Sequence, residues 1–181
     1  VVAAAKRGAR ALGIEYNPDM VALSKSNAIR EGIADKARFI EGDIFKSDFT
    51  QATVITMFLL PELNLKLRPA ILDLKPGTRI VSNSFGMGEW TGDQFVEGGR
   101  KEGCDGNYCE AYLWIVPAKV EGTWKLSQGE LELRQSFQMF TGDLRVGADR
   151  LSVVDGRLSG DRISFRIGDI HCTGRVTGNT M

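Results

Sequence analysis

The fold of this chain is indicated most clearly by one stretch, Ala11-Leu12-Gly13-Ile14-Glu15-Tyr16-Asn17-Pro18. Apolar residues flank Gly13, which allows close backbone packing, and this pattern is typical of a short buried strand. The strand ends at Glu15, and Pro18 can occupy the first turn of a following helix. In an open α/β sheet, an acid at such a strand end accepts hydrogen bonds from the hydroxyls of a ribose. A surface glutamate at a strand end is an equally good interpretation of this stretch alone.

The composition is that of an ordinary globular protein. The chain has 181 residues, 25% of them charged and 43% hydrophobic, which is enough for one good-sized domain or two small ones. Lys plus Arg and Asp plus Glu number 23 each, so net charge gives no evidence for a nucleic-acid or anionic-membrane partner. The longest apolar run, residues 54–60, is far shorter than the roughly 20 residues of a membrane-spanning helix.

The cysteines are few and odd in number: Cys104, Cys109 and Cys172. This favours free thiols in a reducing compartment, and hence a cytoplasmic location. His171 is the one histidine of the sequence, so Cys104 and Cys109 lack the partners of a structural zinc site. We therefore expect no metal.

The first half of the chain alternates between strand and helix patterns. Such alternation favours parallel strands joined by right-handed helical crossovers. The helix over residues 18–31 is expected to bury Met20, Leu23 and Ala28, and Pro69 is expected to kink or break the helix over 63–74. The expected helices are 1–10, 18–31 and 63–74, and the expected strands are 11–16, 37–40, 52–60 and 78–84.

From Gly86 onward the helical period disappears. Residues 86–106 are rich in glycine and charge and indicate a loop. Short alternating segments separated by turn residues follow, which is typical of an antiparallel meander. We therefore predict two domains, an α/β domain over residues 1–110 and a β-rich region over 111–181. The expected strands of the second are 112–116, 122–126, 130–138, 140–146, 150–154, 162–167 and 172–176.

A second acid stands in a position equivalent to that of Glu15. Asp43 follows the next strand in Glu41-Gly42-Asp43, and the ends of neighbouring strands in an open sheet share one crevice. One acid can hold a ribose while the other accepts from the exocyclic amine of an adenine. Ile44 and Phe45 could then flank the base.

These motifs together resemble the class I S-adenosylmethionine-dependent methyltransferases over about residues 1–90. The resemblance rests on Gly13-Ile14-Glu15, Phe39-Ile40-Glu41-Gly42-Asp43, Ala52-Thr53-Val54-Ile55 and Leu74-Lys75-Pro76-Gly77-Thr78-Arg79-Ile80-Val81-Ser82. Within that superfamily the chain is similar to a bacterial group near the Dot1-like and ATP-synthase-subunit lysine methyltransferases. That closer similarity rests on Phe58-Leu59-Leu60-Pro61, on residues 75–82 and on Met87-Gly88-Glu89-Trp90.

The resemblance implies a methyltransferase that uses S-adenosylmethionine as cofactor. It implies that Glu15 binds the ribose with Tyr16 beside it, that Asp43 and Ile44 bind the adenine, and that Met57 and Phe58 line the methionine end. The methyl acceptor would be a protein lysine or a small molecule. No catalytic residue is identified, because alignment of acceptor and methyl group can suffice. Three nearby residues were considered for a site role and are expected to be structural: Glu62, Asn64 and Tyr108.

The sequence departs from the family pattern at its start. The ribose acid of a nucleotide-binding α/β fold lies about 20 residues past a Gly-rich loop, and no such loop precedes Glu15. We therefore expect an N-terminally truncated, incomplete sheet, and we expect residues 1–181 alone to bind S-adenosylmethionine poorly and to transfer no methyl group at a useful rate. The gap would lie where the first strand belongs, between the strands that end at Glu15 and Met57. Its open edges could pair with a second copy of the chain to give a homodimer.

Two other function classes remain as alternatives. An NAD-dependent oxidoreductase would use Glu15 equally well, but Asp43 has no obvious task in hydride transfer. A non-catalytic protein would use the β-rich half as a binding or dimerisation module and keep the nucleotide-binding half as a remnant.

Overall fold

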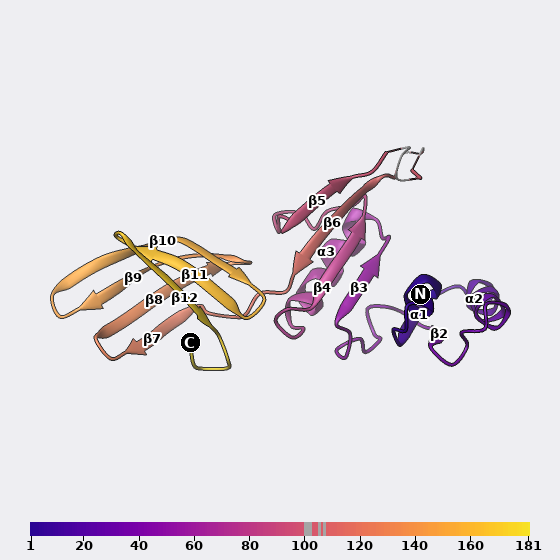
Figure 1. Cartoon of the computed structure of the whole chain (residues 1–181), viewed down its shortest axis with the longest axis horizontal. Helices are drawn as coiled ribbons and strands as arrows, with labels where there is room; N and C mark the ends of the chain where they lie inside the picture. The colour runs from indigo at the N-terminus through magenta and orange to yellow at the C-terminus, as the bar shows by residue number, and fades with distance from the viewer. Residues whose placement is uncertain (100–102, 105, 107) are drawn as a thin grey trace. The chain divides into compact units, whose positions relative to one another are not determined.

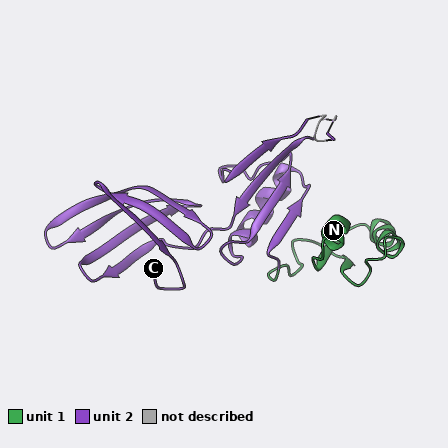
Figure 2. Cartoon of the chain, viewed as in Figure 1, with its two compact units in different colours: residues 1–51 green, residues 52–181 purple. Residues whose placement is uncertain are grey.

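The computed structural model describes residues 1–99, 103, 104, 106 and 108–181 (Figure 1). The described residues divide into two compact units, Val1–Gln51 and Ala52–Met181 (Figure 2). The predicted division of the chain at residue 110 is not tested by this split and stays a prediction.

The first unit holds one small parallel sheet and two helices. Strands β1 (Ala11–Glu15) and β2 (Ala37–Glu41) pair in register from Ala11 opposite Ala37 to Glu15 opposite Glu41. The chain order is α1 (Val2–Lys6), β1, α2 (Pro18–Arg30) and β2. The predicted alternation of helix and strand is therefore present, with α1 four residues shorter at its C-terminal end than expected.

Local chemistry explains the turn from β1 into α2. Asn17 caps the helix, since its Oδ1 accepts from the N–H groups of Asp19 (2.9 Å) and Met20 (3.4 Å). Gly13 lies against the ring of Phe39, and a Cβ there would stand 2.6 Å from Phe39 Cδ1. Close packing at this position therefore requires glycine, as the sequence indicated.

The buried face of α2 differs from the one expected. Val21 and Ala28 are buried, whereas Met20 and Leu23 are 48% and 52% exposed. The small core of this unit, made of Ala5, Ala28, Ile33 and Ala37, has room for short side chains on one narrow stripe of the helix. The longer side chains of Met20 and Leu23, which were expected to be buried, lie outside that stripe.

Four strands of the described part of the second unit form a mixed sheet in the order β3-β4-β6-β5. Strands β3 (Val54–Met57) and β4 (Arg79–Asn83) are parallel and are joined through α3 (Pro61–Leu72). The helix lies along the sheet, buries Leu67 and Ile71, and continues through Pro69 without ending there (Figure 1). Strand β6 (Glu110–Ile115) runs antiparallel to both β4 and β5 (Gln94–Glu97).

Two expectations for this region were wrong. The predicted loop over 86–106 contains strand β5, and its residues 100–102 and 105 lie outside the described residues. The segment 112–116 was assigned to the meander, but β6 pairs within the mixed sheet. Hydrophobic alternation identifies a strand and cannot identify its partner, because every antiparallel strand shows the same period.

Residues 117–181, all of which are described, carry the predicted antiparallel meander. Its core includes Leu131, Leu133, Phe140, Leu158 and Ile163. Strand β10 is longer than expected because a bulge at Asp155, with φ of 55°, carries the pairing past the predicted end. The strands, in spatial as in chain order, are β7 (Gly122–Leu126), β8 (Gly129–Ser136), β9 (Met139–Val146), β10 (Asp149–Ser159), β11 (Arg162–Ile167) and β12 (Ile170–Arg175).

The mixed sheet and the meander are packed directly against each other within the second unit. Gln138 Nε2 donates to the carbonyl of Thr91 at 2.7 Å, and Arg157 pairs with Asp93 at 2.9 Å. Trp90 of the mixed-sheet region stacks on Phe137 of the meander, with ring centroids 5.9 Å apart. These contacts make the meander part of the same compact unit as β3 to β6.

Each of the two sheets that contain parallel strands has an unpaired edge in the described part of the chain. Among the described residues, β1 pairs with β2 on one edge and β3 pairs with β4 on one edge, and neither has a second strand partner.

The expectation of three free thiols was wrong. Cys104 and Cys109 form a disulfide between β5 and β6, with their Cα atoms 5.7 Å apart, and Cys172 is the free cysteine. The short connection brings the two residues within the Cα separation that a disulfide requires, which counting the cysteines could not reveal.

Neither a metal site nor a membrane helix is found in the described part of the chain. No group of three or more His, Cys, Asp or Glu side chains there could hold a metal ion. The helices within that part are too short or too polar for a membrane-spanning segment.

Candidate functional site

Glu15 lies at the carboxyl end of β1 with its side chain exposed. Its Oε1 accepts the N–H of Asn17 at 2.9 Å, which holds the carboxylate at the turn into α2. Among the described residues no donor reaches Oε2. The carboxylate is therefore held by one oxygen and keeps the other available as an acceptor.

Asp43 lies two residues beyond the end of the neighbouring strand. The N–H of Gly42 donates to the carbonyl of Glu15 at 3.0 Å, so the two chain segments remain paired past the last strand residue. Asp43 Oδ1 accepts from Phe45 N–H at 2.9 Å, and its side chain is 35% exposed, with Lys46 Nζ 3.9 Å from Oδ2. The two acids thus stand at the ends of adjacent parallel strands, as the sequence predicted.

This arrangement suits a nucleoside. An ionised carboxylate is an acceptor without donors, and the ribose hydroxyls and adenine amine of S-adenosylmethionine are donors. Tyr16 is 80% exposed beside Glu15, and Ile44 is half-buried beside Asp43. The residues present in the first unit therefore fit the nucleoside part of the cofactor, while their roles stay predictions.

The two residues expected at the methionine end belong to the second unit. Met57 is the last residue of β3 and is 8% exposed, whereas Phe58 is the next residue and is 58% exposed. Consecutive residues at the end of a strand point to opposite faces. Of the two, Phe58 therefore has the accessible side chain, and the side chain of Met57 is buried.

Phe58 belongs to a cluster of three aromatic rings, which we call the ring cluster: Phe58, Phe85 and Tyr108. The ring centroids of Phe58 and Phe85 are 5.8 Å apart with planes at 15°. Tyr108 stands across them, 5.4 Å from Phe58 at 72° and 6.1 Å from Phe85 at 58°. Tyr108 is 55% exposed.

The ring cluster was not predicted from the sequence. Tyr108 was expected to be structural and Phe85 was not considered. A signal for Phe85 was present, because it follows the end of β4 closely, as Phe58 follows the end of β3. No sequence signal indicated Tyr108, because its position depends on β6 pairing antiparallel to β4.

Two asparagines hold the backbone around the ring cluster. Asn64, fully buried in α3, donates from Nδ2 to the carbonyls of Phe85 (3.2 Å) and Gly86 (3.1 Å). Asn83 donates from Nδ2 to the carbonyls of Tyr108 (2.9 Å) and Glu110 (3.0 Å). The structural role expected for Asn64 fits this geometry, and Glu62 lies exposed in the first turn of the same helix.

The neighbourhood of the ring cluster also contains unused hydrogen-bonding capacity. Asn64 Oδ1 and Ser84 Oγ are buried and have no hydrogen-bond partner among the described residues. Ser84 has a φ of 61°, in the left-handed region that non-glycine residues rarely adopt. At the start of β6, Tyr112 donates to Glu110 Oε2 at 3.0 Å, and this bond raises the pKa of the Tyr112 phenol.

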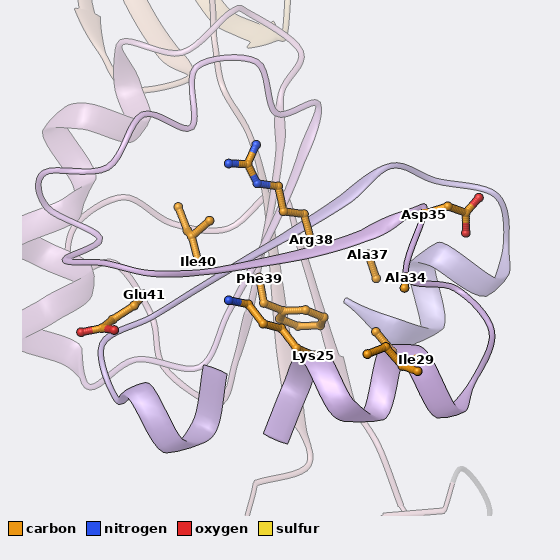
Figure 3. A pocket seen from close by; sticks show the side chains of 10 residues that line it. Lys25, Ile29, Ala34, Asp35, Ala37, Arg38, Phe39, Ile40 and Glu41 are labelled. Atoms are coloured by element: carbon orange, nitrogen blue, oxygen red, sulfur yellow. The ribbon is translucent and has the colours of Figure 1, made fainter. Parts of the chain in front are cut away.

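A pocket of about 730 Å³ lies elsewhere in the first unit, between α2 and β2, and is open to solvent. Figure 3 shows Phe39 on the same side of β2 as Lys25 and Ile29, and Arg38 on the other side. Cations and acids both line it, so it favours neither charge sign. Its lining does not include Glu15 or Asp43.

Comparison with known proteins identifies the first half of the chain. The family model of the ANTKMT methyltransferase domain matches residues 1–94. The chain is 34% identical over 109 residues to a protein-lysine N-methyltransferase of Saccharolobus islandicus, a match that covers 59% of this chain and 65% of that protein. It is 35% identical over 94 residues to the human ATP-synthase-subunit lysine N-methyltransferase, covering 51% of this chain and 40% of that protein. The chain thus spans less than two thirds of the length of these relatives.

A solved structure is similar as well. It is a crystal structure of an RNA methyltransferase from Salinibacter ruber in complex with S-adenosyl-L-homocysteine. The TM-score is 0.58 at 41% sequence identity, over 65% of this chain and 72% of that one. The predicted fold class, a Rossmann-like methyltransferase sheet followed by an antiparallel meander, is confirmed by this similarity together with the sheet topology. The incompleteness of the sheet stays a prediction.

The match of a methyltransferase model to half of the chain leaves no support for the alternative of an NAD-dependent oxidoreductase. It agrees with the two acids at adjacent strand ends, since both lie within the matched residues. The chain belongs to the ANTKMT methyltransferase-domain family, and so to the class I S-adenosylmethionine-dependent methyltransferases that its motifs resemble.

Proposed function

We propose that the protein is an S-adenosylmethionine-dependent methyltransferase that acts on lysine side chains of proteins. The observation that carries the proposal is the pair Glu15 and Asp43, at the ends of adjacent parallel strands inside the region matched by the methyltransferase family model. Such strand ends are where open α/β sheets bind nucleotides.

In this proposal each predicted residue has a part. Glu15, with Tyr16 beside it, binds the ribose, and Asp43 with Ile44 binds the adenine. Met57 and Phe58 line the methionine end. When bound, S-adenosylmethionine supplies an electrophilic methyl group on its sulfonium sulfur, so the chain's own task is to hold donor and acceptor in line.

The lysine acceptor is supported by the relatives. The two curated proteins described above are both named as lysine N-methyltransferases, one from an archaeon and one from human. The chain spans only part of each, so the acceptor is a proposal for the whole protein.

Calorimetry and a transfer assay test the proposal in sequence. Titration of the whole protein with S-adenosylmethionine and, in parallel, with NAD should give saturable binding of the first alone. Incubation with tritiated S-adenosylmethionine and lysine-containing peptides should label them. The same peptides with every lysine replaced by arginine are the matched control. Binding of NAD alone, or equal labelling of both peptide sets, would contradict the proposal.

A methyl acceptor in RNA is the second candidate. The observation that favours it is the 41% identity to a solved structure described as an RNA methyltransferase. The equal numbers of cationic and anionic residues argue against an RNA acceptor, since RNA-binding surfaces carry an excess of Lys and Arg. Adding total RNA to the transfer assay separates the two, because RNA labelling that exceeds peptide labelling would favour this candidate.

The cellular location and the oligomeric state of the protein are separate questions from its reaction. A cytoplasmic location was expected from the cysteine count, and the Cys104–Cys109 disulfide argues against it, because such bonds are rare in reducing compartments. A homodimer formed through open strand edges also stays a prediction.

A further inference from the structure

The ring cluster exposes aromatic surface at the end of the mixed sheet. Phe58 is 58% exposed and Tyr108 is 55% exposed, although both contact other rings. Large aromatic side chains gain free energy when they are buried. Rings that contact one another and stay exposed are therefore available to a ligand.

The strand topology explains why three distant segments meet at this point. Phe58 follows parallel strand β3, and Phe85 follows parallel strand β4, so both lie at the carboxyl edge of the sheet. Strand β6 is antiparallel to β4, so its start, and Tyr108 just before it, lie at the same edge. Carboxyl edges of parallel strands are where α/β enzymes bind their ligands.

The ring cluster is held in place by its surroundings. Asn64 Nδ2 fixes the carbonyl of Phe85, and Asn83 Nδ2 fixes the carbonyl of Tyr108. The faces of Phe58 and Phe85 are nearly parallel, and Tyr108 stands across them at a steep angle. The rings therefore form a corner with walls in two directions rather than a flat patch.

The chemistry of such a corner favours an alkyl cation over a neutral apolar group. The face of an aromatic ring carries negative potential, and a cation within about 6 Å of the ring centroid is attracted to it. The chain already uses this attraction internally, since Arg68 lies 5.3 Å from the centroid of the Phe137 ring.

We propose that Phe58, Phe85 and Tyr108 form the subsite that binds the cationic alkylammonium end of the methyl acceptor. This inference rests on the proposed function. It assigns the recognition of the methyl acceptor to Phe85 and Tyr108 as well as to Phe58. A sulfonium is also an alkyl cation, so the methionine end of the cofactor has the same chemistry. The acceptor is assigned because the cluster extends beyond Phe58 to Tyr108, which lies 50 residues further along the chain and outside the segment matched by the methyltransferase model.

A pair of isosteric probes tests the preference for a cation directly. Choline and 3,3-dimethylbutan-1-ol have the same shape and differ in charge. NMR titrations of the chain should show choline binding about 3- to 30-fold more tightly than the neutral alcohol, with shifts at Phe58, Phe85 and Tyr108. Equal affinities, or shifts confined to other residues, would overturn the proposal.

Matched variants locate the effect. Tyr108→Leu should abolish most of the preference for choline, and Tyr108→Phe should retain it, because the ring face and not the hydroxyl is used. Phe95→Leu is the control, since Phe95 is 52% exposed and contacts the Tyr112 ring outside the cluster. Circular dichroism checks that each variant is folded. Loss of the preference in Phe95→Leu, or its persistence in Tyr108→Leu, would contradict the assignment.

A third arm separates the two sources of cation. The choline titration is repeated at a concentration of S-adenosylmethionine that saturates the chain in calorimetry. An unchanged affinity for choline supports the acceptor subsite, and a loss proportional to cofactor occupancy would assign the rings to the sulfonium instead. Failure of the proposed function has a different signature, because absence of cofactor binding leaves the choline comparison intact.

Discussion

Two regions of the molecule differ in how their residues are held. One is the acid pair at the carboxyl ends of β1 and β2, and the other is the ring cluster at the carboxyl ends of β3 and β4. At the first pair, each acid is held by the chain next to it: Asn17 N–H binds Glu15 and Phe45 N–H binds Asp43. At the second pair, three rings come together from positions 58, 85 and 108, and the side-chain amides of Asn64 and Asn83 hold the backbone of Phe85 and Tyr108.

This difference separates two kinds of binding surface. The acid pair needs short-range contacts and one strand pairing, so its parts can be recognised along the sequence. The ring cluster needs α3, β4 and β6 to be in place together, so it exists only in the folded unit. We therefore expect single substitutions to affect the two ends independently.

The largest effect expected is on the acid pair. Glu15→Ala should weaken S-adenosylmethionine binding by about tenfold or more, because hydrogen bonds to a charged group contribute about 1.5–3 kcal/mol each. Calorimetry measures the change. Glu41→Ala is the matched control, since Glu41 is the exposed register partner of Glu15 on β2 and should leave the affinity unchanged. Unchanged affinity in Glu15→Ala would remove this residue from the site.

The next effect tests whether the ring cluster depends on tertiary contacts. Asn64→Ala should lower the free energy of unfolding of the second unit by about 1–3 kcal/mol, because it leaves the part-buried carbonyls of Phe85 and Gly86 without their donor. Urea unfolding followed by tryptophan fluorescence reports on this unit, which contains Trp90, Trp114 and Trp124. Asn27→Ala, at a surface contact with Arg30 on α2, should change stability by less than about 0.5 kcal/mol.

The same variant also tests whether the acid pair and the ring cluster are independent of each other. Asn64→Ala should reduce choline binding at the ring cluster. The NMR chemical shifts of Glu15 and Asp43 should be the same in this variant as in the unchanged protein. If both ends responded together, they would form one coupled site and the contrast drawn here would be wrong.

The smallest effect expected is at the second acid. Asp43→Asn keeps a carbonyl acceptor of similar size, so its loss of cofactor affinity should be smaller than that of Asp43→Ala. Parallel titration of the two variants with S-adenosylmethionine measures the difference. Equal and negligible losses would mean that Asp43 serves the turn through its bond to Phe45 and does not contact the adenine.

The parts of the fold that were predicted share one property, which is that short-range patterns specify them. Gly13 between apolar residues, Asn17 before Pro18 and the turn residues between the meander strands each act within a few positions. Strand alternation likewise identified the meander strands to within a few residues.

The errors share the opposite property. Met20 and Leu23 have helical spacing, but the core against α2 accommodates Val21 and Ala28 instead. Segment 112–116 has the alternation of a meander strand, but its partners are β4 and β5. Cys104 and Cys109 form a disulfide because the connection between β5 and β6 brings them together.

Patterns along the chain were therefore enough to predict most of the helices and strands, the positions of the acid pair at neighbouring strand ends and the methyltransferase family. Hydrophobic periodicity, helix caps and acids at strand ends each involve residues that are close together along the chain. They can therefore be recognised as sequence patterns. Only the tertiary structure decided which strands pair, which face of α2 is buried and which aromatic rings meet. Those outcomes depend on contacts between residues far apart in sequence, as the meeting of Phe58, Phe85 and Tyr108 shows, and no local pattern encodes them.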